Sequence, residues 1–182
     1  MPGENKGEAE EVRTTGYELY IMRHGIAVER GAASIAEDAK RSLTPEGKKK
    51  MKEIAAGLIR SGFDLDWIVS SPLVRAHETA EIVADELGSR VPLDLCDALR
   101  PGGSPEALIT FLAKRADRRH VLVVGHEPDL SELAARLIGA GRHACLSFKK
   151  GGGCLISFAE FPPKSPGQLV WWLTPKIMRK LG

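Results

Sequence analysis

The chain alternates short apolar segments of strand length with longer segments in which apolar residues recur at helical spacing. Strands are predicted at 18–22, 66–70, 91–95 and 120–125, with helices between them. This alternation is typical of a mostly parallel sheet covered by helices. Two further strands, at 153–158 and 168–173, are separated by a proline-rich turn and predict an antiparallel hairpin at the sheet edge.

Capping residues predict where several helices begin. Thr44 precedes Pro45, an arrangement favoured at the first turn of a helix. A second helix is predicted to open at Ser71–Pro72. Asp129 and Glu132 have the spacing of a capping box, which predicts a helix from that point. The glycine run at 151–153 is predicted to be a flexible turn.

Composition indicates one domain. The chain has 182 residues, of which 43% are hydrophobic and 27% charged, as in ordinary globular proteins. Residues 1–16 are polar and predict a mobile N-terminal tail, so that 17–182 form the domain. The formal net charge of +2 comes from scattered charges, which argues against nucleic acid as a partner.

Other global features point to the cytoplasm. No stretch approaches the roughly 20 apolar residues of a membrane span, so no membrane association is expected. The three cysteines, Cys96, Cys145 and Cys154, lack C-x-x-C spacing, which argues against a disulfide framework and against a zinc site. We therefore expect a cytoplasmic protein without a metal or another cofactor.

The candidate chemistry lies at the ends of the predicted strands. Arg23 and His24 follow the first strand, Arg75 lies just after the second, and His126 follows the strand at 120–125. Ligands of open α/β sheets bind outside the carboxyl ends of the strands, so these side chains should meet. Arginine presents planar, charged forks that match phosphate oxygens. This combination predicts a phosphoryl-transfer site that works without a metal.

The two histidines suit different tasks in such a site. Neighbouring guanidinium groups disfavour a charged imidazole, so His24 should stay neutral and nucleophilic at physiological pH. His126 can donate a hydrogen bond to the phosphoryl group as charge shifts in the transition state.

Three segments together resemble the histidine phosphatase superfamily, also called the phosphoglycerate-mutase-like fold. Leu19–Gly25 carries an Arg-His-Gly signature, Ser70–Thr79 looks like a Ser-Pro-x-x-Arg-Ala-x-x-Thr segment, and Val121–His126 looks like the strand before the second histidine. The resemblance implies a three-layer α/β/α sandwich with a mostly parallel central sheet and an antiparallel edge. It implies that His24 accepts the phosphoryl group, Arg23 and Arg75 clamp it, and His126 stabilises the transition state.

Within this superfamily, the chain is most similar to the short phosphohistidine phosphatases of the SixA type. The small size and the segments 23–27, 41–47, 99–103 and 172–175 carry this similarity. It implies hydrolysis of phosphohistidine through a covalent phospho-His24 intermediate, with Arg41 as an extra phosphate ligand. The implied partner is a phosphorylated protein, such as a histidine-phosphotransfer domain, or a small phosphorylated substrate.

The general acid decides between two substrate classes. Mutases and phosphomonoesterases usually need a proton donor, whereas phosphohistidine releases an imidazole of pKa about 6.5, which needs less protonation. Where longer relatives place an acidic residue, this chain has Leu99–Gly103, which favours P–N cleavage. Glu127 and Asp97 remain candidate acids, and either would make the protein a small-molecule phosphomonoesterase. A phosphate-binding module without catalysis is the third alternative.

Overall fold

The computed structural model describes residues 16–29, 31, 34–115, 117–141 and 145–181. The predicted tail, residues 1–16, lies outside this part of the chain apart from Gly16. None of the helices within the described residues is long and apolar enough to cross a membrane.

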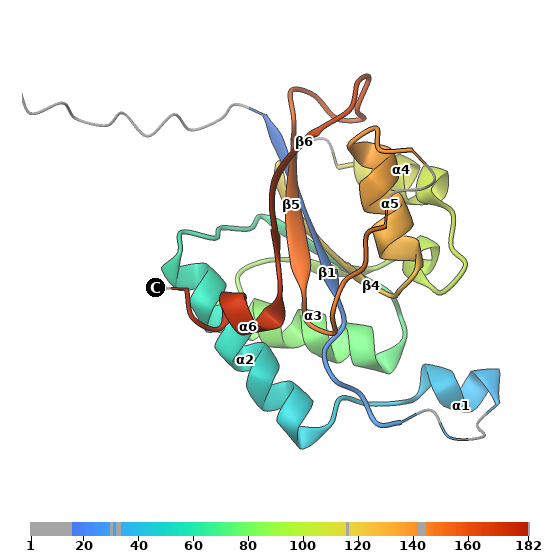
Figure 1. Cartoon of the computed structure of the whole chain (residues 1–182), viewed down its shortest axis with the longest axis vertical. Helices are drawn as coiled ribbons and strands as arrows, with labels where there is room; N and C mark the ends of the chain where they lie inside the picture. The colour runs from blue at the N-terminus through green and yellow to red at the C-terminus, as the bar shows by residue number, and fades with distance from the viewer. Residues whose placement is uncertain (1–15, 30, 32–33, 116, 142–144, 182) are drawn as a thin grey trace, which may run out of the picture.

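Six strands form one sheet in the order β3-β2-β4-β1-β5-β6 (Figure 1). Strands β1 to β4 pair in parallel, whereas β5 pairs antiparallel with both β1 and β6. The mostly parallel sheet with an antiparallel edge is therefore confirmed. The strands are β1 (Tyr17–Arg23), β2 (Trp67–Ser70), β3 (Leu93–Leu95), β4 (His120–Gly125), β5 (Gly153–Phe158) and β6 (Gln168–Leu173).

Helices pack on both faces of this sheet (Figure 1). Side chains alternate between faces along β1, so that Tyr20 and Met22 join one core cluster while Leu19 and Ile21 join the other. The first cluster includes residues of α2, α3 and α6, and the second includes residues of α4 and α5. The helices are α1 (Ile35–Ala39), α2 (Pro45–Arg60), α3 (Val74–Glu86), α4 (Pro105–Ala113), α5 (Asp129–Leu137) and α6 (Pro175–Met178), with a 3-10 turn at Asp97–Leu99.

The predicted start of α2 is confirmed, but that of α3 is wrong. Thr44 caps α2, because its hydroxyl oxygen accepts a hydrogen bond from the Gly47 amide at 2.9 Å. Helix α3 begins at Val74 rather than at 71–72. The Ser71 amide still donates to Val124 of the neighbouring strand, so the backbone there follows the sheet before it turns into the helix.

The predicted capping box of α5 is also wrong. Asp129 is already the first helical residue, and Pro128 occupies the capping position without a side-chain hydrogen bond. The Asp129 carboxylate instead accepts a hydrogen bond from the Gly102 amide at 3.0 Å. This carboxylate therefore ties α5 to the loop that follows the 3-10 turn.

Gly57 allows α2 to pack closely against the end of α6. A Cβ atom at this position would lie 2.1 Å from the carbonyl oxygen of Met178. Helix propensity alone favours alanine over glycine by about 1 kcal/mol. Because the backbone contact outweighs this preference, we expect Gly57→Ala to lower the free energy of unfolding by about 1 to 3 kcal/mol.

Urea unfolding measures this effect. Ala56→Gly, at the neighbouring and only half-buried position of α2, is the control and should cost about 0.5 to 1 kcal/mol through propensity alone. An unchanged or raised unfolding midpoint for Gly57→Ala would contradict the close approach of α2 and the α6 backbone.

Candidate active site

The two histidines lie next to each other at the carboxyl ends of β1 and β4. Arg23 pairs with Gly125 in the ladder, and the His24 amide donates to the Gly125 carbonyl at 3.1 Å. The ring centroids of His24 and His126 are 5.1 Å apart, with their planes at 52°. Both side chains are buried, so the central strands hold both rings firmly.

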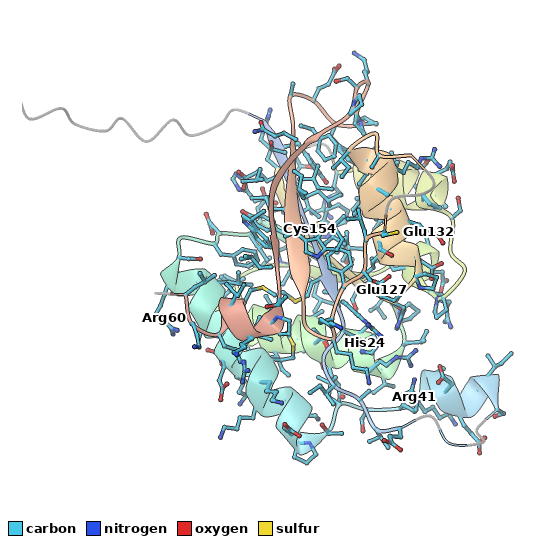
Figure 2. The ribbon with its side chains drawn as sticks, in the orientation of Figure 1. His24, Arg41, Arg60, Glu127, Glu132 and Cys154 are labelled. Carbon is cyan, nitrogen blue, oxygen red and sulfur yellow. The ribbon has the colours of Figure 1, made fainter. Side chains whose placement is uncertain are left out.

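A cavity of about 500 Å³ opens over these rings. Its lining includes the four residues that the sequence predicts as the phosphoryl-transfer site, together with Arg41 and Glu127. Figure 2 shows His24, Arg41 and Glu127 on the same side of the molecule, beyond the carboxyl end of β1. The sequence analysis assigned no role to the remaining lining residues, which are Ile35, Asp38, Ala39, Leu73, Arg100 and Pro101.

The hydrogen bonds of His24 determine which of its nitrogens can attack. Its Nδ1 atom lies 2.7 Å from the carbonyl oxygen of Gly25, which can only accept. Nδ1 therefore carries the proton. Nε2 is then the unprotonated nitrogen, and it accepts a hydrogen bond from Nε of Arg75 at 3.3 Å. The lone pair available to a phosphorus atom is thus that of Nε2.

Burial and neighbouring cations keep His24 neutral. Burial lowers its pKa to about 3; the Gly25 carbonyl opposes this shift, while Arg75, Arg23 and Lys150 add to it. The sequence-based argument gave the guanidinium groups the main role, whereas the structure gives it to burial. At physiological pH the imidazole is therefore in its nucleophilic form.

His126 is neutral for similar reasons. Burial lowers its pKa to about 3, assisted by His24 and Arg75 and opposed by Asp38. Its Nε2 atom lies 2.9 Å from the hydroxyl oxygen of Ser71, which also accepts a bond from the Leu73 amide. This arrangement favours a Ser71 hydroxyl that donates to Nε2, with the imidazole proton on Nδ1. Nδ1 is buried and has no hydrogen-bond partner within the described residues.

The two predicted phosphate-clamping arginines are held in different ways. Nη1 of Arg23 donates to the carbonyl oxygen of Phe148 at 2.7 Å, and burial lowers the pKa of this guanidinium. Arg75 is buried, and its Nη1 and Nη2 atoms donate to the backbone and the carboxylate of Asp38 at 2.9 and 3.2 Å. Both guanidinium groups are thus oriented before a ligand arrives.

Thr79 connects the segment after β1, which carries His24, to the helix that carries Arg75. Its hydroxyl oxygen accepts a hydrogen bond from the Gly25 amide at 3.0 Å and donates its proton to the Arg75 carbonyl at 2.7 Å. Thr79 is the last residue of the segment that resembles the superfamily pattern, and this contact gives a physical reason for a threonine there.

The two candidate acids lie in different surroundings. Asp97 is exposed, forms an ion pair with Arg100 at 2.6 Å, and is not among the residues that line the cavity. Glu127 does line the cavity, but both of its oxygens accept hydrogen bonds. One accepts from the Phe148 amide, and the other from the Ser131 hydroxyl at 2.7 Å.

The glycine run before β5 forms the predicted turn, and its backbone is hydrogen-bonded to that of Arg23 and His24. Gly151, Gly152 and Gly153 are all buried. The Gly151 amide donates to the carbonyls of Arg23 and His24, and the Arg23 amide donates to the Gly152 carbonyl at 3.0 Å. These bonds place Lys150, an exposed residue that the sequence did not indicate, close enough to lower the pKa of His24.

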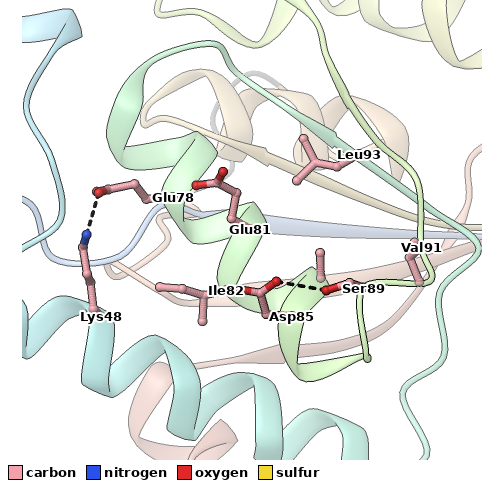
Figure 3. A pocket seen from close by; sticks show the side chains of 9 residues that line it. Lys48, Glu78, Glu81, Ile82, Asp85, Ser89, Val91 and Leu93 are labelled. Atoms are coloured by element: carbon pink, nitrogen blue, oxygen red, sulfur yellow. Dashed lines mark hydrogen bonds and ion pairs between the residues drawn. The ribbon is translucent and has the colours of Figure 1, made fainter.

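A second hollow of about 410 Å³ lies between α3, the start of α2 and the segment leading into β3 (Figure 3). Its polar lining is mostly acidic, and Glu78 forms an ion pair there with Lys48 at 2.6 Å. Neither a histidine nor an arginine lines it, so it lacks the groups that bind and transfer a phosphoryl group. The candidate site is therefore the cavity over His24 and His126.

Comparisons with known proteins identify relatives of this chain. Residues 19–101 match the histidine phosphatase superfamily (branch 1). The phosphohistidine phosphatase SixA of Escherichia coli strain K12 is 30% identical over 122 residues, which cover 66% of this chain and 73% of that protein. A probable phosphoglycerate mutase of Erwinia tasmaniensis is 29% identical over 148 residues, which cover 76% of this chain and 67% of that protein.

A solved structure confirms the predicted fold class. The protein histidine phosphatase SixA complexed with tungstate superimposes with a TM-score of 0.75 at 24% identity, covering 88% of this chain and 99% of the solved chain. The 30% identity to SixA, together with the matched segment, shows that the chain belongs to the histidine phosphatase superfamily, in its SixA-type branch.

Proposed function

We propose that the protein is a metal-independent phosphatase that hydrolyses phosphohistidine on a partner protein through a phosphorylated His24. The observation that carries this proposal is the neutral, buried His24, whose unprotonated Nε2 faces Arg75 in the cavity. A cytoplasmic location fits the odd number of cysteines.

The first chemical step transfers the phosphoryl group to His24. Its Nε2 lone pair forms a bond to phosphorus while the P–N bond of the substrate breaks. That electron pair stays on the substrate ring, which leaves as a neutral imidazole when its other ring nitrogen carries a proton. Arg23 and Arg75 neutralise the phosphoryl oxygens, and Nδ1–H of His126 donates to one of them. Nδ1–H of His24 keeps its bond to the Gly25 carbonyl, so the ring stays oriented.

The second step restores the enzyme. A water molecule attacks phosphorus on the face opposite Nε2, the P–Nε2 bond breaks, and its electron pair returns to the imidazole. The proton of the water leaves with the phosphate product or to solvent. No proton has to be delivered to the Nε2 leaving atom, because the neutral ring is already its resting form.

The positions and hydrogen bonds of Asp97 and Glu127 favour phosphohistidine over a phosphate ester as the substrate. An alkoxide leaves badly without a proton donor, whereas an imidazole of pKa about 6.5 needs much less help. Asp97 lies outside the cavity, and both Glu127 oxygens accept hydrogen bonds from the protein. The partner we propose is a histidine-phosphotransfer domain or another protein that carries phosphohistidine.

Phosphate release without added metal tests this proposal. We expect a phosphohistidine-bearing protein to be hydrolysed with a higher kcat/KM than an aryl or alkyl phosphate, and a chelator to leave the rate unchanged. A phosphomonoester preference would overturn the substrate assignment. Tight binding of the phosphoprotein without turnover would indicate the binding module instead.

The alternative, a small-molecule phosphomonoesterase with Glu127 as its acid, rests on the place of this residue in the cavity wall. Glu127→Gln separates the two functions. A glutamine can still accept from the Phe148 amide and contact Ser131, but it cannot deliver a proton at neutral pH. We expect kcat/KM for phosphohistidine to stay within about fivefold of wild type, since the loss of one hydrogen bond costs about 1 kcal/mol.

The same variant should be assayed with alkyl phosphates across pH. A loss of about 100-fold or more with alkyl phosphates, together with loss of the alkaline limb of the pH profile, would identify Glu127 as a general acid. Ser131→Ala, which removes one of the donors to Glu127 without removing the carboxyl group, is the matched control.

A further inference from the structure

We propose that Asp38 is a positioning residue of this site, which holds Arg75 and Arg41 together as one oxyanion-binding unit. The inference deepens the proposed function and rests on it for the role of Arg75. Asp38 lies on α1, a short helix that no motif in the sequence indicated.

The Asp38 carboxylate joins two guanidinium groups with different oxygens. Oδ1 accepts from Nε of Arg41 at 2.8 Å, and Oδ2 accepts from Nη2 of Arg75 at 3.2 Å. Its backbone carbonyl also accepts from Nη1 of Arg75 at 2.9 Å. The Asp38 side chain is only 14% exposed, so these contacts are shielded from water.

Each of the two arginines also donates a hydrogen bond to a group other than Asp38. Nε of Arg75 points to Nε2 of His24, and Nη1 of Arg41 donates to the Val28 carbonyl at 2.6 Å. With Asp38 in place, Arg75 has its Nε atom fixed by the nucleophile and its Nη atoms fixed by α1. The orientation of Arg75 toward His24 therefore depends on Asp38.

Physical reasoning explains why a carboxylate is needed here. Two guanidinium groups that line one cavity repel each other, and an arginine side chain loses up to about 2 kcal/mol of rotamer entropy when it is fixed. A carboxylate between them offsets the repulsion and fixes both forks before the substrate binds. Preorganised donors of this kind need no reorientation as charge develops on the phosphoryl oxygens.

Two other roles for Asp38 predict different results. As a general acid, it would matter most for substrates with basic leaving groups. As a stand-in for the phosphate, it would compete with the substrate for Arg75, and its removal would strengthen oxyanion binding. Simple Coulomb attraction also predicts tighter anion binding once a negative charge is removed. Only a positioning role predicts weaker binding.

The experiment compares wild type with Asp38→Asn, which keeps the size of the side chain and removes its charge. Binding of inorganic phosphate, measured by calorimetry, should weaken by about tenfold, and kcat/KM should fall by about 10- to 100-fold. The loss should be equal for aryl phosphates whose leaving groups differ in pKa. Thermal unfolding of the variant verifies that it is folded.

Two further variants keep the test decisive. Glu37→Gln changes the neighbouring residue of α1, whose carboxylate bonds to Ser34 and to neither arginine, and should leave phosphate affinity unchanged. The double variant Asp38→Asn/Arg41→Gln completes the test. Its loss of phosphate affinity should be smaller than the sum of the losses in the two single variants, because both changes break the same unit.

The outcomes separate this inference from the proposed function. Unchanged or tighter phosphate binding by Asp38→Asn overturns the positioning role, even if phosphohistidine remains the preferred substrate. A loss that grows with the pKa of the leaving group would assign Asp38 as the acid. If the wild-type enzyme prefers a phosphomonoester, the proposed substrate fails, while the calorimetric result still decides the role of Asp38.

Discussion

Replacing His24 by alanine should lower kcat/KM for phosphohistidine hydrolysis by roughly four to six orders of magnitude, the scale seen when an enzyme loses its nucleophile. The structure gives the reason: Nε2 of His24 is the unprotonated nitrogen, oriented by the Gly25 carbonyl on one side and Arg75 on the other. His126 cannot replace it, because its Nε2 atom is engaged by Ser71.

Rapid quenching with a radiolabelled phosphohistidine substrate tests the covalent step. Wild type should yield an acid-labile, base-stable phosphoenzyme that maps to the peptide containing His24, and His24→Ala should yield none. His77→Ala changes a half-buried histidine on α3 that does not line the cavity, and it should behave as wild type. Labelled His24→Ala protein, or an activity loss of less than about 100-fold, would place the nucleophile elsewhere.

Acid should destabilise the protein strongly through the same two histidines. Their pKa values are lowered to about 3 in the folded state, against about 6.5 in an unfolded chain. Between these values the unfolded state binds more protons than the folded state, so the free energy of unfolding rises with pH and falls as acid is added. Each histidine contributes a slope of about 1.4 kcal/mol per pH unit within that window.

Urea unfolding at several pH values between 4.5 and 7 measures this slope. His24→Asn and His126→Asn should each flatten the curve by about 1 kcal/mol per pH unit relative to wild type. Because the wild type and the variants share the same carboxylates, the difference between their curves isolates the contribution of the histidine to the pH dependence of the free energy of unfolding. A pH dependence unaffected by His24→Asn and by His126→Asn would show that folding does not lower the pKa values of these rings.

The sequence predicted those parts of the fold that local pattern controls. Strand 120–125 is confirmed to the residue, and Thr44 caps α2 as expected, because a bounded apolar run and a Thr-Pro pair are local signals. The start of α3 was missed, since the bond from the Ser71 amide to Val124 depends on the neighbouring strand. Asp129 was misread because its carboxylate bonds to a distant loop rather than to its own helix.

The candidate site shows the same division. His24 and His126 were found because each directly follows a strand, and adjacent parallel strands bring their ends together. Asp38 was missed because α1 buries none of its own residues and so has no hydrophobic period to reveal it. The glycine run at 151–153 looked flexible because its partners, the backbones of Arg23 and His24, lie far away in the sequence.

The exposure of α1 affects which substitutions the wall of the cavity can tolerate. The helix contributes Ile35, Asp38 and Ala39 to the cavity wall, yet none of its residues is buried, and Ile35 is 86% exposed. Substitutions at exposed positions usually change stability by less than about 0.5 kcal/mol. The two histidines, in contrast, are joined to the centre of the sheet. Apart from Asp38, this wall can therefore accumulate mutations that alter substrate preference at little risk to folding or to the chemical step.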